Sequence, residues 1–385
     1  MKAHVLSGID RIEAVEKQLA GRRVGLMTNP TGITHDLRST IDVVNERFNL
    51  TALFAVEHGI RGDAQAGDKV DTMVDATTGV TVYSTYGEHR AYTQEKLEAF
   101  DVLVFDMQDV GARFYTYLYS LANAMKACAA AGKPVIVLDR INPLGGARRQ
   151  GTVIEPELGS FVGNYGLPTR YGLTIGEYAR YVKDELHLNL DLTVVPLSGW
   201  ERSMYLDDTD LPWVAPSPNC HDLATALCYI GTCIFEGTNI SEGRGTTQPF
   251  QLIGAPFLDG ERLERVMNAL ELPGLHFRRT AFRPTFSKHA GELCHGVQMH
   301  VLDRQIADTF AGGLLLLDEI RRQAPEKLDF LQWIPDAPYS IDRLLGTADY
   351  RTGKRTALEL IEQSREPVKA FSERVKPFEL YGNGG

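Results

Sequence analysis

The stretch Asp101-Val102-Leu103-Val104-Phe105-Asp106 is the clearest strand signal in this chain of 385 residues. Its four central residues are all apolar, without the polar alternation of a strand that has one face in water. Such a run is typical of a strand that is covered on both faces of a parallel sheet. The stretch therefore predicts a buried strand that ends in an acidic residue.

Further short apolar runs occur on both sides of this stretch. They are residues 24–27, 50–56, 80–83, 134–138 and 190–197. Residues 41–48 and 117–131 have the spacing of helices, and Gly132 is placed to end the second one. The alternation of strands and helices predicts an α/β fold with a Rossmann-like parallel sheet that is doubly wound.

The length predicts two domains, because single hydrophobic cores stop growing near about 250–300 residues. We assign residues 1–250 to a Rossmann-like N-terminal domain and residues 251–385 to a smaller α+β domain. In the second domain, residues 276–286 and 296–301 have the pattern of antiparallel strands. Residues 306–323 have the pattern of an amphipathic helix.

The composition excludes several classes of partner. A net charge of −10 repels phosphate backbones, so nucleic acid is not expected. No apolar stretch approaches the roughly 18 residues of a membrane span, and the first residues lack the pattern of a signal peptide. Five cysteines without a C-x-x-C pair argue against a disulfide framework or a zinc site. We expect a cytoplasmic protein whose oligomeric state the sequence leaves open.

Acidic residues follow three of the predicted strands. They are Glu57, Asp106, Asp109 and Asp139. Because ligands bind outside the carboxyl ends of strands in open parallel sheets, these acids are candidate site residues. Each also has a structural alternative: Asp109 or Asp139 could cap a helix, and Asp106 could pair with Arg113 or Arg140.

Glu57 is the hardest of the four to explain structurally. Glutamate is a poor helix cap, and Gly59 and Gly62 follow it in a predicted loop where the backbone could approach a ligand closely. Several acids in one cleft suit glycosidic cleavage, in which one carboxyl group donates a proton and another stays ionised. The same acids, with His58, could instead hold Mg²⁺ or Mn²⁺.

Two further segments carry groups that suit sugars. Residues 239–247 combine an acid, a base, an amide and three hydroxyl groups in a loop without periodicity, where Arg244 could form a fork with a carboxylate. Residues 113–117 offer aromatic faces, although these could equally pack at a helix start. Nucleotide motifs such as G-x-G-x-x-G and the P-loop are absent, so no cofactor is expected. Thr174 and Glu177 fit a capping box.

At this point the motifs resemble a known family. The segments VEHGIRG, DMQDVGARFYTY, VLDRINPLGG, TRYGLTIGEYA, EGTNISEGRGTTQPF and IGAPF occur in the order found in the exo-β-N-acetylmuramidase family of glycoside hydrolases. The resemblance implies a Rossmann-like catalytic domain, a smaller domain that closes the cleft, and release of N-acetylmuramic acid from the non-reducing end of β-1,4-linked peptidoglycan fragments.

The resemblance also implies site residues. The glutamate of the family's P-E-H-G motif falls on Glu57, and the other acidic motif positions fall on Asp106, Asp109 and Glu242. The residues predicted to bind substrate are His58, Arg61, Arg113, Tyr117, Asn142, Tyr171, Asn219, Asn239, Ser241 and Arg244. No metal is assigned to the site.

The chain departs from the family pattern at Val56, Ile141, Tyr171 and Cys220-His221. Tyr171 stands where a histidine is expected, which bears on sugar specificity. Our leading hypothesis is an exo-acting glycosidase with Glu57 as general acid, Asp109, Asp106 or Glu242 as partner, and Arg244 or Arg61 at the lactyl carboxylate. The alternatives are a metal-dependent hydrolase and a protein that binds muropeptide sugars without cutting them.

Overall fold

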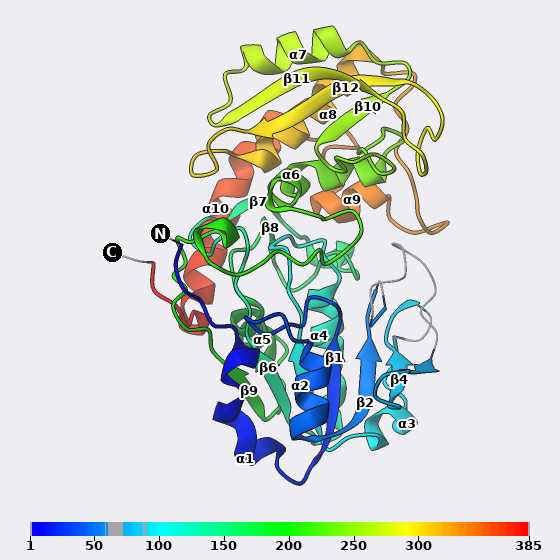
Figure 1. The fold of residues 1–385 in the computed structure, drawn as a ribbon. Coiled ribbons are helices and arrows are strands. Elements are labelled where there is room, and N and C mark those ends of the chain that lie inside the picture. Colours follow the sequence, from blue (N-terminus) through cyan, green and yellow to red (C-terminus); the bar gives the residue numbers. More distant parts are fainter. Residues whose placement is uncertain (1, 58, 61–71, 88–89, 384–385) are drawn as a thin grey trace.

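Seven strands form one sheet in the lower lobe of the computed structural model, in the order β3-β4-β2-β1-β5-β6-β9 (Figure 1). The structure describes residues 2–57, 59–60, 72–87 and 90–383. The strands are β1 (Arg23–Thr28), β2 (Asn49–Ala55), β3 (Met73–Val74), β4 (Thr81–Ser84), β5 (Val102–Asp106), β6 (Val135–Leu138) and β9 (Leu192–Val195). All pairs are parallel except the β3–β4 edge pair, and this order is that of a Rossmann-type sheet. The predicted fold class is confirmed.

Helices cover both faces of this sheet, as the apolar runs predict. Val102 and Val104 of β5 pack into a core with the first 3₁₀ helix and α2, whereas Leu103 and Phe105 pack into a second core with α4 and α5. Side chains alternate between the faces of a strand, so a continuous apolar run supplies both cores. The helices of this lobe are η1 (Gly8–Val15), α1 (Glu16–Leu19), α2 (Thr40–Arg47), α3 (Gln94–Glu98), α4 (Tyr117–Ala130) and α5 (Ile175–Glu185).

Local sequence signals set the ends of two helices. Thr174 and Glu177 form the predicted capping box of α5, in which each side chain bonds to the other residue's backbone amide. Gly132 follows α4 with a φ of +64°, the left-handed conformation that glycine adopts without strain.

The upper lobe is a three-stranded antiparallel sheet against helices. Its elements are α6 (Leu223–Thr232), η5 (Cys233–Gly237), β10 (Leu252–Ala255), α7 (Gly260–Ala269), β11 (Leu275–Phe282), β12 (Cys294–Val301), α8 (Thr309–Gln323) and α9 (Ser340–Leu345). Strand β12 pairs with β11 and β10, so the two predicted strands are confirmed. Helices α6 and α8 cross at Gly231 and Gly313, where an added Cβ would lie about 2 Å from the facing backbone.

Several elements connect the lobes, and the sequence patterns missed them. The hairpin of β7 (Gln150–Val153) and β8 (Pro168–Arg170) lies beside α10 (Ala357–Val375), which continues into η6 (Lys376–Phe378) (Figure 1). Pro367 lies inside α10 and obscures its periodicity. Strand β10 and helix α7 are further elements that we did not predict; two short 3₁₀ turns, η3 (Pro156–Leu158) and η4 (Leu206–Asp208), complete the architecture.

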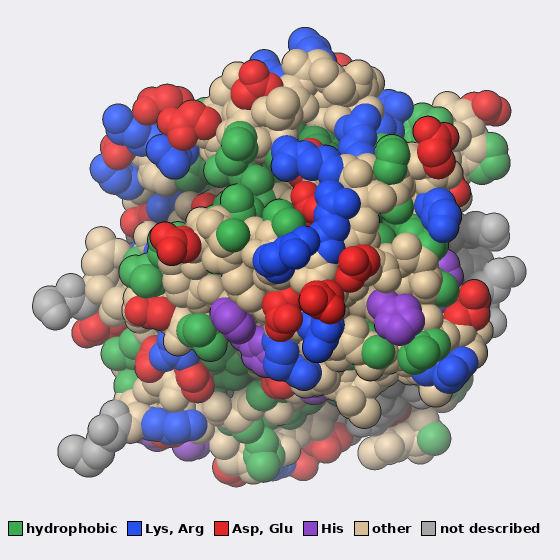
Figure 2. Space-filling model, turned by 90° about the horizontal axis from the view of Figure 1, so that it is seen from above, with side chains coloured by type: hydrophobic (Ala, Val, Ile, Leu, Met, Phe, Trp, Pro, Cys, Tyr) green, Lys and Arg blue, Asp and Glu red, His purple; other side chains and the backbone are tan. Residues whose placement is uncertain are grey.

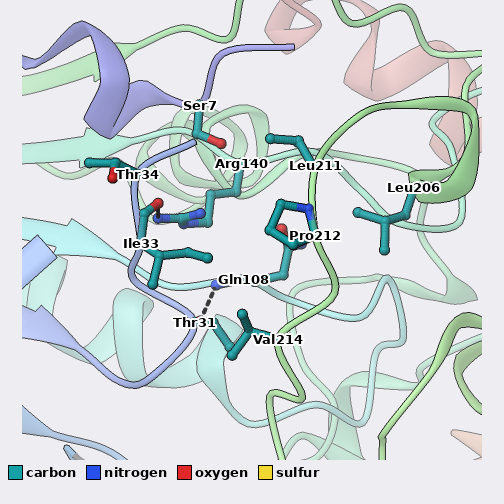
Figure 3. A pocket seen from close by; sticks show the side chains of 10 residues that line it. All are labelled: Ser7, Thr31, Ile33, Thr34, Gln108, Arg140, Leu206, Leu211, Pro212 and Val214. Atoms are coloured by element: carbon teal, nitrogen blue, oxygen red, sulfur yellow. Dashed lines mark hydrogen bonds between the residues drawn. The ribbon is translucent and has the colours of Figure 1, made fainter. Parts of the chain in front are cut away.

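The crevice at the carboxyl ends of β1 and β5, where a Rossmann-type sheet usually binds its ligand, is filled by protein. Nε and Nη2 of Arg140 donate to the two carboxylate oxygens of Asp106, at 2.5 and 2.8 Å. Arg140 also donates to the Ile33 carbonyl. The Gln108 amide donates to Thr31 (Figure 3). What is left is a pocket of about 20 Å³, room for roughly one water molecule.

The surface carries charges of both signs. On the face seen in Figure 2, basic and acidic side chains are interspersed rather than separated by sign. None of the helices that the structure describes is both long and apolar enough to cross a bilayer.

Replacing Asp106 by alanine is expected to destabilise the protein by about 3–5 kcal/mol, because the buried guanidinium of Arg140 would lose its counter-ion. The matched control is Glu46→Gln, which breaks the exposed pair with Arg38 and should cost less than about 1 kcal/mol. Urea unfolding followed by circular dichroism measures both. Equal effects of the two substitutions would contradict the structural role of Asp106.

Candidate active site

A cleft of about 1050 Å³ lies between the lobes. Residues from both lobes line the cleft, so it forms only where the two lobes pack against each other. The lower lobe contributes Glu57, Tyr86, Arg90, Phe114, Tyr115, Thr116 and Phe161, and the upper lobe contributes Tyr229, Glu236, Glu242, Arg244, Phe250, Phe286, Lys288, Trp333 and Arg343. Asn219 and Cys220 of the connecting segment also line it.

Glu57 lies at the floor of the cleft, on the side of the lower lobe, two residues beyond the end of β2. Two hydroxyl groups hold its carboxylate. Thr116, which precedes α4, donates to Oε2 at 2.7 Å, and Tyr86, beyond β4, donates to Oε1 at 2.8 Å. Two strand ends and one helix start thus meet at one carboxylate in the cleft.

This arrangement allows Glu57 to exist in both protonation states. As a carboxylate, Glu57 accepts one bond on each oxygen. As a carboxylic acid, it can donate to one of the same hydroxyl groups, which rotate and accept. Burial and the Glu57 charge raise the pKa of Tyr86, so Tyr86 stays a neutral hydroxyl group. Thr116 and Tyr86 can therefore both hold the Glu57 carboxyl group while they stay uncharged themselves.

The second set of acids belongs to the upper lobe. Glu242 is buried, with Lys288 Nζ at 2.8 Å and Arg244 Nε at 3.3 Å from its oxygens. Glu236 pairs with Arg244, whose guanidinium also lies over the Phe250 ring at 5.0 Å. Arg244 is thus held by two carboxylates and a ring. It orders the wall of the cleft.

Arg343 of α9 is a cation of the cleft whose charge is not paired with a described residue. Among the described residues, no carboxylate or carbonyl pairs with its guanidinium, whereas Arg90 donates to the Gly87 carbonyl and lies over Phe161. Among the described residues, three carboxylates and four cations line the cleft, so this part of the lining is slightly positive in a chain of net charge −10. This local sign favours an anionic ligand.

Aromatic side chains form much of the remaining wall. Of the predicted segment 113–117, Phe114, Tyr115 and Thr116 line the cleft. At the upper edge, Phe286 is 47% exposed and Trp333 is 43% exposed. Exposed rings beside a polar cleft offer flat apolar faces of the kind that sugar rings contact.

Asp109 lies outside the cleft lining. It is buried and accepts hydrogen bonds from the Tyr171 hydroxyl and from the Gly111 amide. Burial raises the pKa of Asp109 to about 7, although these hydrogen bonds oppose the shift. Tyr171, the departure from the family's histidine, therefore acts on Asp109 inside the protein.

Asp106 and Asp139 are also enclosed by protein rather than open to the cleft. Asp106 is bound by Arg140, as one of our structural alternatives stated. Asp139 accepts from the Gly176 amide near the start of α5, at 2.7 Å, although the N-cap residue of α5 is Thr174 rather than Asp139. A catalytic role for Asp106 would require the buried ion pair to open.

Most other predicted substrate contacts point into the protein. Arg113 donates to backbone carbonyls, Tyr117 donates to Pro216, Asn142 to Leu173, and Asn239 to Lys327, while Ser241 accepts from the Gly243 amide. None of these five lines the cleft. Asn219, Glu242 and Arg244 do. His58 and Arg61 lie outside the described residues.

Sequence reasoning missed several cleft residues, among them Tyr86, Glu236, Lys288 and Arg343. Glu236 stands at the edge of the polar loop that we did identify. Tyr86 stands two residues beyond the end of β4, a strand-end position that we did not use. Lys288 and Arg343 come from segments without a motif, so only the packing of the lobes brings them to the site.

The fold and the cleft define a class: a two-lobed α/β protein in which carboxylates, cations and aromatic rings face one cleft, as in carbohydrate-active sites. The model of the family described as exo-beta-N-acetylmuramidase NamZ, N-terminal, matches residues 24–224, and its C-terminal counterpart matches residues 227–381. The chain belongs to this family. The domain boundary near residue 250 stays a prediction, although the two matches meet near residue 225.

Individual relatives agree with this assignment over the whole chain. The peptidoglycan beta-N-acetylmuramidase NamZ of Bacillus subtilis (strain 168) is 47% identical, and the match covers 99% of this chain and 92% of the relative. A crystal structure of a DUF1343 family protein from Bacteroides fragilis superposes with a TM-score of 0.89 at 34% identity, covering 98% and 99% of the two chains. A second such structure gives 0.78 at 29% identity, covering 99% of both.

The buried carboxyl group of Asp139 should make the stability of the protein depend on pH. Burial raises the pKa of Asp139 to about 7, so the folded protein keeps a proton that the unfolded chain releases near pH 4. Stability should fall as the pH rises from about 4 to 7. Asp139→Asn removes the buried charge and keeps the acceptor for Gly176. Relative to the wild type, it should gain about 2–3 kcal/mol between pH 5 and 8 in urea unfolding. A difference that is constant with pH would contradict this.

Proposed function

We propose that this protein is an exo-acting glycoside hydrolase that releases N-acetylmuramic acid from the non-reducing end of β-1,4-linked peptidoglycan fragments. The observation that carries the proposal is the Glu57 carboxyl group, held by two hydroxyl groups at the floor of a slightly positive cleft. The activity named for the Bacillus subtilis relative supports the same conclusion.

In the proposed reaction, Glu57 acts as the general acid. It donates its proton to the glycosidic oxygen while the bond between that oxygen and C1 of the muramic acid breaks. The leaving sugar departs as an alcohol, and water supplies the oxygen at C1 and returns one proton to Glu57. Thr116 and Tyr86 are positioning residues, because they hold both oxygens of Glu57 through the change of protonation state.

Glu242 is the partner carboxylate that we favour. Of the three predicted partners, Glu242 lines the cleft, whereas Asp106 and Asp109 do not. Lys288 and Arg244 both pair with the Glu242 carboxylate, at 2.8 and 3.3 Å. An ionised carboxylate opposite the acid can stabilise the positive charge that develops on the sugar ring.

Arg343 is the residue that we propose for the lactyl carboxylate of muramic acid. We expected Arg244 or Arg61 in this role, but Arg244 is already paired with Glu236 and Glu242. Arg343 faces the cleft without such a partner among the described residues. A guanidinium binds a carboxylate through two parallel hydrogen bonds, which a sugar without the lactyl group cannot make.

The two alternatives have less support. A metal-dependent hydrolase needs Asp106 and Asp109 to face a shared ion, but Arg140 binds both oxygens of Asp106, and Tyr171 binds one oxygen of Asp109. A binding protein without catalysis would not need two hydroxyl groups that hold both oxygens of Glu57. We keep the cytoplasmic location as part of the proposal; all five cysteines are buried free thiols.

Glu57→Gln is expected to lower kcat/KM by about 10²–10⁴ on a disaccharide of N-acetylmuramic acid and N-acetylglucosamine, because glutamine cannot donate a carboxyl proton. The loss should be smaller on a 4-nitrophenyl β-N-acetylmuraminide, whose leaving group needs less protonation. Glu46→Gln, an exposed change on α2, is the matched control and should leave both rates unchanged. Equal losses on both substrates would remove Glu57 from the role of acid.

Arg343→Gln should weaken competitive inhibition by N-acetylmuramic acid by about 10- to 100-fold, the loss expected for a charge-assisted hydrogen bond. Inhibition by N-acetylglucosamine, which lacks the lactyl group, should not change. Arg90→Gln is the control, since Arg90 lines the same cleft but is engaged with Phe161. If both sugars lost the same factor, Arg343 would shape the cleft rather than select the substrate.

A further inference from the structure

A group of metal-ligand side chains lies on the lower lobe, outside the cleft. His4, His35 and Asp210 each offer one ligand atom, and the three atoms lie within 4.8 Å of one another. None of the three residues lines the cleft. Across the ranges that the structure describes, this is the one place where three histidine, cysteine or acidic ligands converge so closely.

The two imidazole rings point at the same carboxylate oxygen. Nδ1 of His4 lies 2.6 Å and Nε2 of His35 lies 3.0 Å from Oδ2 of Asp210, and the rings meet edge to face at 4.9 Å. Nε2 of His35 is shielded from solvent, yet its contact lacks the geometry of a hydrogen bond with any described residue. A shielded nitrogen without a well-formed hydrogen bond is costly, and a bound cation would satisfy it.

Backbone contacts already orient the ligands. The Val5 amide donates to Oδ1 of Asp210 at 3.0 Å, which leaves Oδ2 free to face the histidines. The His35 amide donates to Asp10 at 2.7 Å. Outer contacts of this kind fix ligands in metal sites.

We propose that His4, His35 and Asp210 form a binding site for one Zn²⁺ ion, with water as the fourth ligand. Two imidazole nitrogens and one carboxylate oxygen are a donor set that suits Zn²⁺. Tetrahedral bonds of about 2.0–2.1 Å place ligand atoms roughly 3.3 Å apart, so His4 and His35 need only small shifts away from Asp210. The His4 side chain is 66% exposed and is free to make such a shift.

The ion would join three segments that are distant in the sequence. Ala3 already pairs with the backbone on either side of Thr209, and His35 belongs to the loop after β1. The neighbours of two ligands, Thr34 and Leu211, line the small pocket that closes the sheet crevice (Figure 3). The site would therefore act as a structural clasp over this crevice and leave catalysis unchanged.

The test uses full-length protein without a purification tag, stripped with a chelator and titrated with ZnCl₂ by calorimetry. We expect one equivalent to bind with a Kd in the micromolar range, together with a higher Tm. His35→Gln should weaken binding by at least about tenfold. His4→Gln is a second variant on an exposed side chain and should do the same. The matched control is His221→Gln, which changes another exposed histidine beside an acid.

Two results would overturn the proposal. One is the absence of saturable binding below about 1 mM Zn²⁺ by wild-type protein. The other is stoichiometric binding that survives both His4→Gln and His35→Gln. Neither readout involves muraminide cleavage, so the outcome is independent of the proposed function.

Discussion

The buried ion pair between Asp106 and Arg140 is the constraint on which the position of the active site depends. It occupies the carboxyl ends of β1 and β5, where a sheet of this topology usually holds its ligand. Two charges enclosed in this way stabilise each other only while both are present. With the central crevice closed, the open space lies beyond β2, and Glu57 is the strand-end acid that faces it.

The cleft gains its chemistry from two lobes with different tasks. The lower lobe presents Glu57 on a rigid strand end, with Thr116 and Tyr86 fixing both oxygens. The upper lobe supplies paired charges around Glu242 and the available guanidinium of Arg343. In the proposed reaction, the lower lobe would place the proton donor and the upper lobe would select the anionic sugar.

The four acids at the strand ends occupy similar positions in the sheet but differ in the residues that surround them. All four follow parallel strands at one edge of the sheet, but Asp106 meets a guanidinium, Asp109 meets Tyr171, and Asp139 meets the start of α5. Glu57 alone of the four lines the cleft. Burial raises the pKa of Asp109 and Asp139, and neither carboxyl group lines the cleft.

The sequence by itself determined the doubly wound sheet, the caps of α4 and α5, and the choice of Glu57, because apolar runs, capping pairs and strand ends are local signals. The motifs also identified the family. Only the tertiary structure decided which polar residues face the cleft: Arg113 and Asn142 turned inward, and Arg343 came from a distant helix without a motif. The physical reason is that exposure to the cleft depends on how two lobes pack, and no local pattern encodes that contact.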